Sequence, residues 1–315
     1  MTASDSFTPP FSCSIAAVIV TYNPDFLLLQ RLIKQLRKST CNIYIVDNYY
    51  SASSSSRVQS LASENQVKLI SCRKNLGIAS GFNLGVEAAK KDLHPLVMLF
   101  DQDSVPQDGL IEEMEAAAGR IRLEDTQVAA IGPRLYDPRS KQFFKFALLK
   151  WGIWKKIGCD QGNQSFIPCE FINASGSLIF LDLWERIGPF RNELFIDHVE
   201  TEWYMRIRAM PFKCYGYCSQ HYLEHHMGDD VCRYWLGKWR WMPHRSPQRH
   251  YTIVRNALWL WRYDYTPLSW KINSLVKAIF TLFYFSIFDE ARKDQFRCIL
   301  RGMKDGVFSR PRLAK

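Results

Sequence analysis

The sequence lacks any pair of cysteines in a CxxC arrangement, and its nine cysteines are odd in number and widely dispersed. That pattern suits neither a zinc site nor a disulfide framework, so it predicts reduced thiols in a cytoplasm. Residues 1–14 also lack a basic segment followed by an apolar one. We therefore expect no secretory signal there, and we expect 1–14 to be a flexible lead-in.

Long hydrophobic runs are also missing, since a membrane-spanning helix needs about 20 apolar residues. The most apolar stretch, 275–288, contains Lys277 and is flanked by Lys271, Asp289 and Glu290. It falls short of a spanning segment. We expect either an amphipathic helix lying on a bilayer or a core helix, and the sequence does not choose between them.

What the chain does have is bulk and positive charge. Its 315 residues are 47% hydrophobic, and lysines and arginines outnumber acids to give a formal charge of +10. The length allows one large domain with an appended piece. The charge indicates an anionic partner, which could be a diphosphate, a phospholipid headgroup or a nucleic acid.

The first half alternates short β-branched runs with stretches of helical periodicity, which predicts an α/β fold with helices on both faces of a sheet. The predicted strands are 15–20, 43–46, 67–71, 96–100 and 128–131. The predicted helices are 26–37, 58–65, 81–90 and 108–122. Open α/β sheets bind ligands at the carboxyl ends of their strands, so the loops after these strands are the first place to look for chemistry.

Several segments depart from this alternation. The serine run 51–56 predicts a flexible loop, and the irregular segment 137–167 predicts a long excursion near a binding site. Periodicity then returns, with a strand expected at 177–181, a helix at 199–209 and a strand at 213–218. We expect a catalytic domain over 15–230.

The interval after Asp230 contains no acidic residue before Asp264, and it interleaves seven basic residues with five tryptophans. Basic and aromatic side chains together suit an anionic, amphipathic partner such as a membrane surface. We therefore expect 231–315 to be a basic, tryptophan-rich helical extension that associates with a membrane.

Two carboxylates end the predicted strand 96–100, because Asp101, Gln102 and Asp103 follow it directly. Side chains two residues apart share one face of an extended backbone. Paired carboxylates repel one another unless a cation lies between them, and hard cations such as Mg²⁺ or Mn²⁺ prefer oxygen ligands. Taken alone, the motif also fits an ordinary turn with solvated acids.

Polar signatures follow three other strands as well, and they would meet at the same edge of the sheet. They are Thr21-Tyr22-Asn23-Pro24, Asp47-Asn48, and the glycine-containing run from Asn75 to Gly85. Each is weak evidence alone, since Asp47 suits an Asx turn and the glycines suit close helix packing.

Together these segments resemble the family-2 glycosyltransferases of the GT-A fold, over most of 15–262. The resemblance rests on VTYNP at 20–24, VDN at 46–48, NLGIA at 75–79, DQDS at 101–104, FIDHVETEW at 195–203 and YTIVRN at 251–256. The last three segments look most like the bacterial rhamnosyltransferases that use dTDP-L-rhamnose. The fold expected is a nucleotide-sugar-binding GT-A domain with a mixed central sheet and a C-terminal helical extension.

The resemblance implies a donor site and a metal site. The implied donor-binding residues are Thr21, Tyr22, Asn23, Asp47, Asn75, Gly77, Asp101, Gln102 and Arg255. Among them, Asp47 would bond the pyrimidine base. The implied ligands of Mg²⁺ or Mn²⁺ are Asp101, Asp103 and His225. The sequence departs from the family at Tyr49 and Tyr50, where small polar residues are usual, so the shape of the base pocket stays open.

A second acidic cluster opens the predicted helix 199–209. An inverting transfer needs a carboxylate that takes the proton from the acceptor hydroxyl. The family motif places this base at Glu200, and Asp197 is its rival because the motif is not matched in full. An exposed acidic helix N-terminus, favoured by the helix dipole, is the structural alternative.

The resemblance implies a peripheral enzyme on the cytoplasmic face of the inner membrane. It would pass L-rhamnose from dTDP-L-rhamnose to a lipid-linked saccharide in O-antigen or similar polysaccharide synthesis. Transfer of galactofuranose or N-acetylglucosamine from a UDP donor is the alternative within this class. Basic residues interleaved with aromatics also suit nucleic-acid binding, but Asp101 and Asp103 would repel a polyanion, so no nucleic-acid partner is expected.

Overall fold

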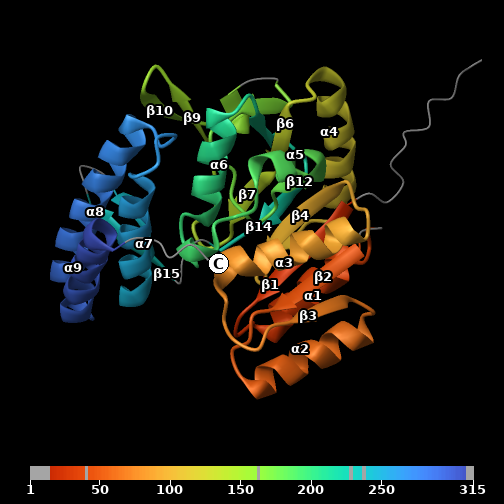
Figure 1. The fold of residues 1–315 in the computed structure, drawn as a ribbon, viewed down its shortest axis with the longest axis horizontal. Helices are drawn as coiled ribbons and strands as arrows, with labels where there is room; N and C mark the ends of the chain where they lie inside the picture. The colour runs from red at the N-terminus through yellow and green to blue at the C-terminus, as the bar shows by residue number, and fades with distance from the viewer. Residues whose placement is uncertain (1–14, 40–41, 162–163, 227–229, 236–238, 310–315) are drawn as a thin grey trace, which may run out of the picture.

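The structure is a computed structural model that describes residues 15–39, 42–161, 164–226, 230–235 and 239–309. Its body is an eight-stranded mixed sheet with helices on both faces (Figure 1). From edge to edge the strands are β11 (Phe166–Pro168), β13 (Lys213–Tyr217), β6 (Val128–Gly132), β12 (Leu178–Phe180), β4 (Leu96–Asp101), β1 (Ile15–Thr21), β2 (Asn42–Asp47) and β3 (Lys68–Ser71). Strands β11 and β12 pair antiparallel with their neighbours, and the other pairs are parallel.

The two faces of the sheet are covered by different helices because successive strand residues point to opposite sides. On β1, Ile15, Ala17 and Ile19 pack under α1 (Phe26–Leu36), α2 (Ala52–Glu64) and α4 (Leu110–Glu124). Ala16, Val18 and Val20 pack under α3 (Gly77–Lys91), α5 (Leu181–Ile187) and α6 (Val199–Ala209). The predicted α/β class is confirmed, and the predicted strand and helix at each of these positions exist.

Smaller sheets surround the body. A four-stranded sheet has the order β5 (Val105–Pro106), β14 (Tyr222–Glu224), β7 (Arg134–Asp137) and β8 (Gln142–Phe143). Strands β9 (Phe146–Lys150) and β10 (Ile153–Ile157) form one hairpin, and β15 (Asp230–Trp235) and β16 (Trp239–His244) form another. Short 3₁₀ turns occur at η1 (Cys159–Gln161) and η2 (Asn192–Leu194).

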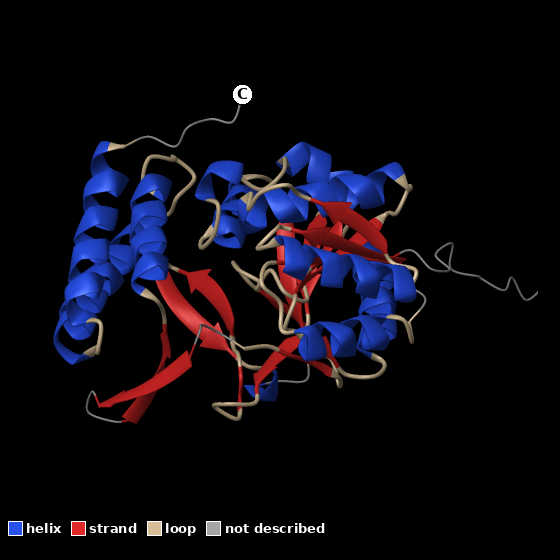
Figure 2. Ribbon diagram, turned by 90° about the horizontal axis from the view of Figure 1, so that it is seen from below, coloured by secondary structure: helices blue, strands red, loops and turns tan. Residues whose placement is uncertain are grey.

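Three helices follow and stand together beside the sheet: α7 (Pro247–Leu260), α8 (Leu268–Phe288) and α9 (Arg292–Phe308) (Figure 2). The expected helical extension is therefore present, although it begins with the β15–β16 hairpin. The side chains of Arg233, Trp235, Trp239, Arg240 and Trp241, on which the membrane expectation partly relied, lie outside the described part of the chain.

Helix α8 is longer than the sequence indicated. It has 21 residues because the helical run begins at Leu268, ahead of the apolar stretch expected at 275–288. Among the described helices it is the one with the length and composition to cross a membrane, and only 11% of its apolar window is buried. The expectation that this segment is too short to span is therefore wrong on length, and so is the core-helix alternative.

The serine run 51–56 is not a loop. Ser51 is the N-cap of α2, and its hydroxyl accepts a hydrogen bond from the Ser54 amide at 3.2 Å. Serine is among the best N-cap residues because its oxygen satisfies an amide that has no partner within the helix. The serines after it form the first turns of α2, with Ser54 buried, so low complexity was a poor guide here.

The expectation of reduced thiols is wrong for one pair. Cys159 in η1 and Cys218 at the end of β13 form a disulfide, with their Cα atoms 5.5 Å apart. They are 59 residues apart in the sequence, so no local spacing could reveal the pair. Cys72, Cys169, Cys214 and Cys298 are free thiols, as expected.

Candidate active site

The carboxyl ends of β1, β2 and β4 bring most of the predicted site residues to one edge of the sheet. In the register, Val20 lies beside Asp101 and Thr21 lies beside Asp47. The pKa of Asp101 is raised to about 7, first because surrounding protein desolvates it and then because Asp103 and Glu200 carry charge nearby. The expected pair of repelling acids is therefore present, and Glu200 is close enough to add to the repulsion.

This pair fits a divalent cation by its chemistry. Asp101 keeps 32% of its side chain exposed, so its oxygens can reach a ligand. The described residues contain no ready-made group of three or more His, Cys, Asp or Glu ligands. Mg²⁺ is commonly held by one or two carboxylates, with substrate phosphates and water completing its shell, and two aspartates meet that description.

His225, the third predicted ligand, is buried behind the acids. Its Nδ1 lies 2.8 Å from the Ser104 hydroxyl and 3.9 Å from an Asp101 oxygen, and its Nε2 lies 3.2 Å from the Asn173 amide nitrogen. Burial is the main reason that its pKa is lowered to about 4, so the ring is neutral. To ligate a metal it must exchange one of these two hydrogen bonds.

The loop before β12 supports the same acids, and sequence reasoning missed it. The Asn173 side chain accepts a hydrogen bond from the Ser175 amide at 3.1 Å, and the Ser175 hydroxyl accepts one from the Asp101 amide at 3.1 Å. The chain Ser104, His225, Asn173, Ser175 thus ends at the backbone of Asp101. The segment Asn173-Ala-Ser-Gly176 is polar, but no periodicity distinguishes it from an ordinary turn.

Asp47 lies on the other side of β1 and is almost fully buried, at 2% exposure. The Thr21 hydroxyl donates to its Oδ1 at 3.4 Å, whereas Oδ2 has no hydrogen-bond partner among the described residues. Buried carboxylate oxygens are nearly always bonded, so this oxygen is available to a donor group on a ligand.

Two hydrogen bonds join the Gln102 side chain to the backbone of Tyr22. The Gln102 amide accepts from the Tyr22 backbone NH at 2.7 Å and donates to the Tyr22 carbonyl at 3.1 Å. The Tyr22 ring is 45% exposed and meets the ring of Tyr50 edge to face, with centroids 5.3 Å apart. The departure at Tyr50 therefore adds an aromatic wall to this edge of the sheet. Asn23 follows in the left-handed region, with φ of 49°.

Gly77 has a packing role in the structure. Its φ is 83°, and a Cβ there would lie 2.5 Å from the carbonyl oxygen of Phe195. That carbonyl accepts a hydrogen bond from the Ile78 amide at 2.7 Å, while the Asn75 side chain accepts from the Gly77 amide at 2.9 Å. Asn75 and Gly77 therefore hold the loop that begins at Phe195 against the start of α3.

That loop carries three non-glycine residues with positive φ: Phe195, Asp197 and His198. Such residues persist only where their surroundings fix them, and they gather at functional sites. The Asn256 amide nitrogen lies 2.8 Å from the carbonyls of Leu194 and Ile196 and 3.0 Å from that of Asp197. Helix α7 therefore holds the loop in place, although it lies beyond the expected catalytic domain.

The two rival bases sit in different surroundings. Asp197 accepts hydrogen bonds from Arg249 at 2.7 and 3.1 Å and from Thr252 at 2.7 Å. Burial raises its pKa, but these bonds outweigh burial, so the net shift is downward. The pKa of Glu200 is raised, first by burial and also by the charge of Asp197. Asp197 is thus a weak proton acceptor, and Glu200 a better one.

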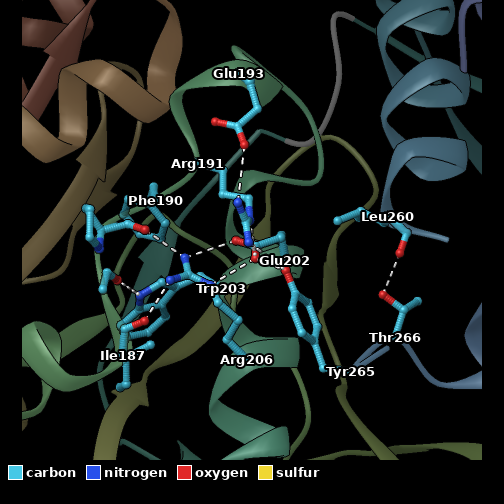
Figure 3. A network of polar contacts seen from close by, with 12 residues as sticks. Ile187, Phe190, Arg191, Glu193, Glu202, Trp203, Arg206, Leu260, Tyr265 and Thr266 are labelled. Atoms are coloured by element: carbon cyan, nitrogen blue, oxygen red, sulfur yellow. Dashed lines mark hydrogen bonds and ion pairs between the residues drawn. The ribbon is translucent and has the colours of Figure 1, made fainter. Parts of the chain in front are cut away.

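Glu202, the third acid of this turn, is fully enclosed by partners (Figure 3). Arg191 donates to it at 2.9 Å, Arg206 at 3.0 Å, and the Tyr265 hydroxyl at 2.5 Å. Arg206 also donates to the Ile187 carbonyl at 2.7 Å. Glu202 therefore links α6, the turn before η2 and the chain after α7, which is a structural role. The acidic turn is not simply an exposed helix N-terminus.

Of the two arginines on α7, the structure brings Arg249 rather than Arg255 to the acids. Arg255 lies 4.3 Å above the Trp259 ring and donates to the Asn256 side chain at 2.8 and 3.0 Å. Arg249 bonds Asp197, and its charge lowers the pKa of both Asp101 and Glu200. The two arginines differ in their position on the helix face, and the resemblance had named only Arg255 for donor binding.

A mixed sheet with paired carboxylates at the end of β4, beside a helix that presents a further acid, is the architecture of a GT-A glycosyltransferase. Residues 16–169 match the family model for Glycosyl transferase family 2. The chain therefore carries a family-2 glycosyltransferase domain, and it is a glycosyltransferase, as the sequence resemblance indicated.

The chain is also similar to individual glycosyltransferases. It is 28% identical over 292 residues to the dTDP-rhamnosyl transferase RfbF of Shigella flexneri, covering 90% of each chain. Among solved structures, it is similar to the mannosyltransferase PcManGT from Pyrobaculum calidifontis in complex with GDP-Man and Mn²⁺. That likeness has a TM-score of 0.54 and 13% identity, and it covers 93% of this chain and 75% of that one. S. aureus TarS 1-349 matches with a TM-score of 0.54 and 12% identity, over 93% and 81% of the two chains.

Proposed function

We propose that this enzyme transfers L-rhamnose from dTDP-L-rhamnose to a lipid-linked saccharide, with inversion, in the synthesis of a bacterial surface polysaccharide such as O-antigen. The proposed sugar rests on the likeness to the Shigella flexneri dTDP-rhamnosyl transferase. The observation that carries the chemistry is the meeting of strand ends that places Asp101 beside β1 at one edge of the sheet. Burial and the nearby charges of Asp103 and Glu200 raise the pKa of Asp101 there.

We propose that Asp101 and Asp103 hold Mg²⁺ or Mn²⁺, which when bound neutralises charge on the departing diphosphate. A bound cation would relieve the repulsion between the two carboxylates. His225 would hold the metal with them only after releasing Ser104 or Asn173. In either arrangement it also supports the loop that hydrogen-bonds the Asp101 backbone.

Donor recognition is assigned to the neighbouring strand ends. The free Asp47 Oδ2 would accept a hydrogen bond from the imide NH of a thymine or uracil base. Tyr22 and Tyr50 would stand beside the base, and Asn23, Asn75 and Gly77 around the ribose. Gln102 acts by holding Tyr22. Arg255, also named from the resemblance, would act through Asn256 rather than on the donor.

The proposed base is Glu200. As the acceptor oxygen bonds to the anomeric carbon, its proton passes to the Glu200 carboxylate. The bond from that carbon to the diphosphate oxygen breaks on the opposite face, and the nucleoside diphosphate leaves with the electron pair. Asp197 is less suited, because protonating it would break its bonds to Arg249 and Thr252. We propose that Asp197 instead positions Arg249 near the diphosphate.

We propose a peripheral location on the cytoplasmic face of the inner membrane. The outer face of α8 carries a continuous apolar stripe of exposed side chains, which are Leu268, Ile272, Val276, Ile279, Phe283 and Ile287. Their spacing of three to four residues keeps them on one side of the helix. An apolar helix face of this kind suits the boundary between lipid headgroups and acyl chains.

The test is a panel of donors, namely dTDP-rhamnose, UDP-galactofuranose and UDP-N-acetylglucosamine, with hydrolysis and transfer measured with Mn²⁺ and after chelation. We expect dTDP-rhamnose to be preferred and chelation to abolish turnover. Asp103→Ala should behave like chelated enzyme. Asp108→Ala is the matched control, since Asp108 is an exposed aspartate paired with Lys38. Full activity of Asp103→Ala would overturn the proposed metal role of Asp103. Preference for a UDP donor would overturn the proposed donor.

A further inference from the structure

The β9–β10 hairpin ends in an exposed apolar tip. Trp151 is 89% exposed and Ile153 64%. The two-residue turn places Trp151 and Gly152 in the left-handed region, with φ of 55° and 76°. Such a turn suits glycine, whereas a bulky residue there is rare. The hairpin thus holds a large aromatic side chain at its apex on a strained backbone, and little of that side chain packs against the described residues.

The charge around the tip has one sign. Between residues 138 and 159 the sequence has six basic residues and no acid. Lys145, Lys150, Lys155 and Lys156 are exposed along the two strands. Tryptophan flanked by lysines is typical of proteins that touch anionic bilayers, because the ring settles at the headgroup level and the ammonium groups meet lipid phosphates.

The hairpin is also joined to α8. The Trp154 ring stacks on Phe171 at 5.3 Å and packs with Trp270 of α8 in one cluster. The pKa of Lys277, in the middle of α8, is lowered first by burial and then by the nearby charge of Lys156. Figure 1 shows the hairpin standing beside the end of α8. Its tip and the apolar stripe of α8 therefore belong to neighbouring elements with a shared core.

We propose that the β9–β10 hairpin is a second bilayer contact, which inserts Trp151 and Ile153 among the headgroups of an anionic membrane while its lysines bind the lipid phosphates. This inference rests on the peripheral location proposed above and adds a defined second anchor.

The hairpin also connects to the site. Ala147 of β9 pairs with Phe171, and the Glu170 amide donates to the Ala147 carbonyl at 2.7 Å. Two residues beyond Phe171, Asn173 contacts His225. Two anchors on rigidly joined elements fix the orientation of a protein on a surface, whereas one permits rotation. The hairpin therefore fixes how the active site faces the layer in which a lipid-linked acceptor lies.

The experiment is sedimentation of the full chain with vesicles of phosphatidylcholine alone or mixed with phosphatidylglycerol. The variant Trp151→Ala/Ile153→Ser should partition at least about tenfold more weakly, because it loses the two apolar side chains that would insert among the headgroups. Leu93→Ala is the matched control: Leu93 is also 89% exposed with positive φ, but it follows α3. It should bind like wild type. Lys150→Gln/Lys155→Gln should lose most of the preference for the anionic vesicles.

Unchanged partition of the tip variant would overturn the inference, as would wild-type protein that ignores both vesicles. A tip variant that binds vesicles normally but loses a dimer in size-exclusion chromatography would show that the tip meets a second copy instead. Thermal unfolding of each variant excludes misfolding as the cause of lost binding. Donor hydrolysis without vesicles should be unchanged in the tip variant, so failure of the proposed reaction is seen separately from failure of the anchor.

Discussion

Helices α6 and α8 invert the usual relation between polarity and burial. Helix α6 has 11 residues, of which two are glutamates and two are arginines. Six of the 11 are nevertheless buried, and Glu202 is one of the six. Helix α8 is the most apolar of the described helices, yet only three of its 21 residues are buried. Soluble proteins normally cover the second kind of helix and expose the first.

Each exception has a physical reason. In α6 the buried charge of Glu202 is matched by two arginines and a tyrosine hydroxyl, and matched charges are the form in which buried ions occur. Glu200 is the acid in the same turn that lacks such matching, and its charge raises the pKa of Asp101. For α8, no element in the described part of the chain covers the outer stripe. The first turn of α6 therefore has the features of a catalytic site, and the outer face of α8 has the features of a binding surface.

The largest expected effect is on Glu200. Glu200→Gln should lower turnover about 10²- to 10⁴-fold, the usual contribution of a general base, while donor binding is kept. Because burial raises the pKa of Glu200, its ionised form destabilises the fold at neutral pH, so the amide should leave the melting temperature equal or higher. Single-turnover kinetics and thermal melts measure both. An active variant would move the role of base to Asp197.

Glu202→Gln, two residues along, should give the opposite result. Removing one partner from a buried ion pair destabilises by about 3 to 5 kcal/mol, because Arg191 and Arg206 lose their counter-charge. Urea unfolding should show this loss. Glu185→Gln, an exposed partner of Lys90, should change stability by less than about 1 kcal/mol. Equal stability of the two variants would refute the structural role of Glu202.

Asp197→Asn tests the third acid, and asparagine tolerates its left-handed backbone. Because the pKa of Asp197 is lowered in the fold, its stabilisation is present above the ordinary aspartate value and is lost as pH falls through the folded one. We expect about 2 kcal/mol less stability at pH 7, and a shallower decline on acidification. Melting curves from pH 7 to pH 3 that run parallel to wild type would contradict this.

The smallest expected effect on stability is in α8. Phe283→Ser with Ile287→Ser should change the free energy of unfolding by no more than about 0.5 kcal/mol, as is usual for exposed sites, because these side chains are 63% and 57% exposed. Vesicle binding by this double variant should nevertheless be weaker than that of the wild type. A strong loss of stability would show that the stripe is covered within the protein.

The sequence sufficed for the α/β body because its strands are buried runs with strong periodicity. The cluster Thr21, Asp47, Asp101 and Asp103 was predictable for a related reason, since parallel strands must bring their carboxyl ends to one edge. The family resemblance also favoured Glu200 over Asp197. The pKa of Glu200 is raised and that of Asp197 is lowered, and the role of Glu200 as the base stays a proposal.

What could not be predicted depends on contacts between distant segments. Nothing in the spacing of Cys159 and Cys218 indicates a bond. Asn173 and Asn256 are single amides in unremarkable stretches, and their roles appear only when the chain folds His225 and Asp197 against them. The position of Arg249 rather than Arg255 depends on the rotation of α7, which amphipathic periodicity defines too loosely.

The Asn256 side chain has a consequence for where the protein can be shortened. One amide on α7 grips three carbonyls of the loop that leads into Glu200, and α7 in turn packs along α9. A truncated protein ending near residue 230 would retain the proposed metal ligands and the strand-end residues assigned to the nucleotide, but it would lose Arg249 and the backbone geometry that positions Glu200. Shortened forms of the protein for crystallography or biocatalysis must therefore keep the C-terminal helices. These include α8, whose exposed apolar side chains favour aggregation.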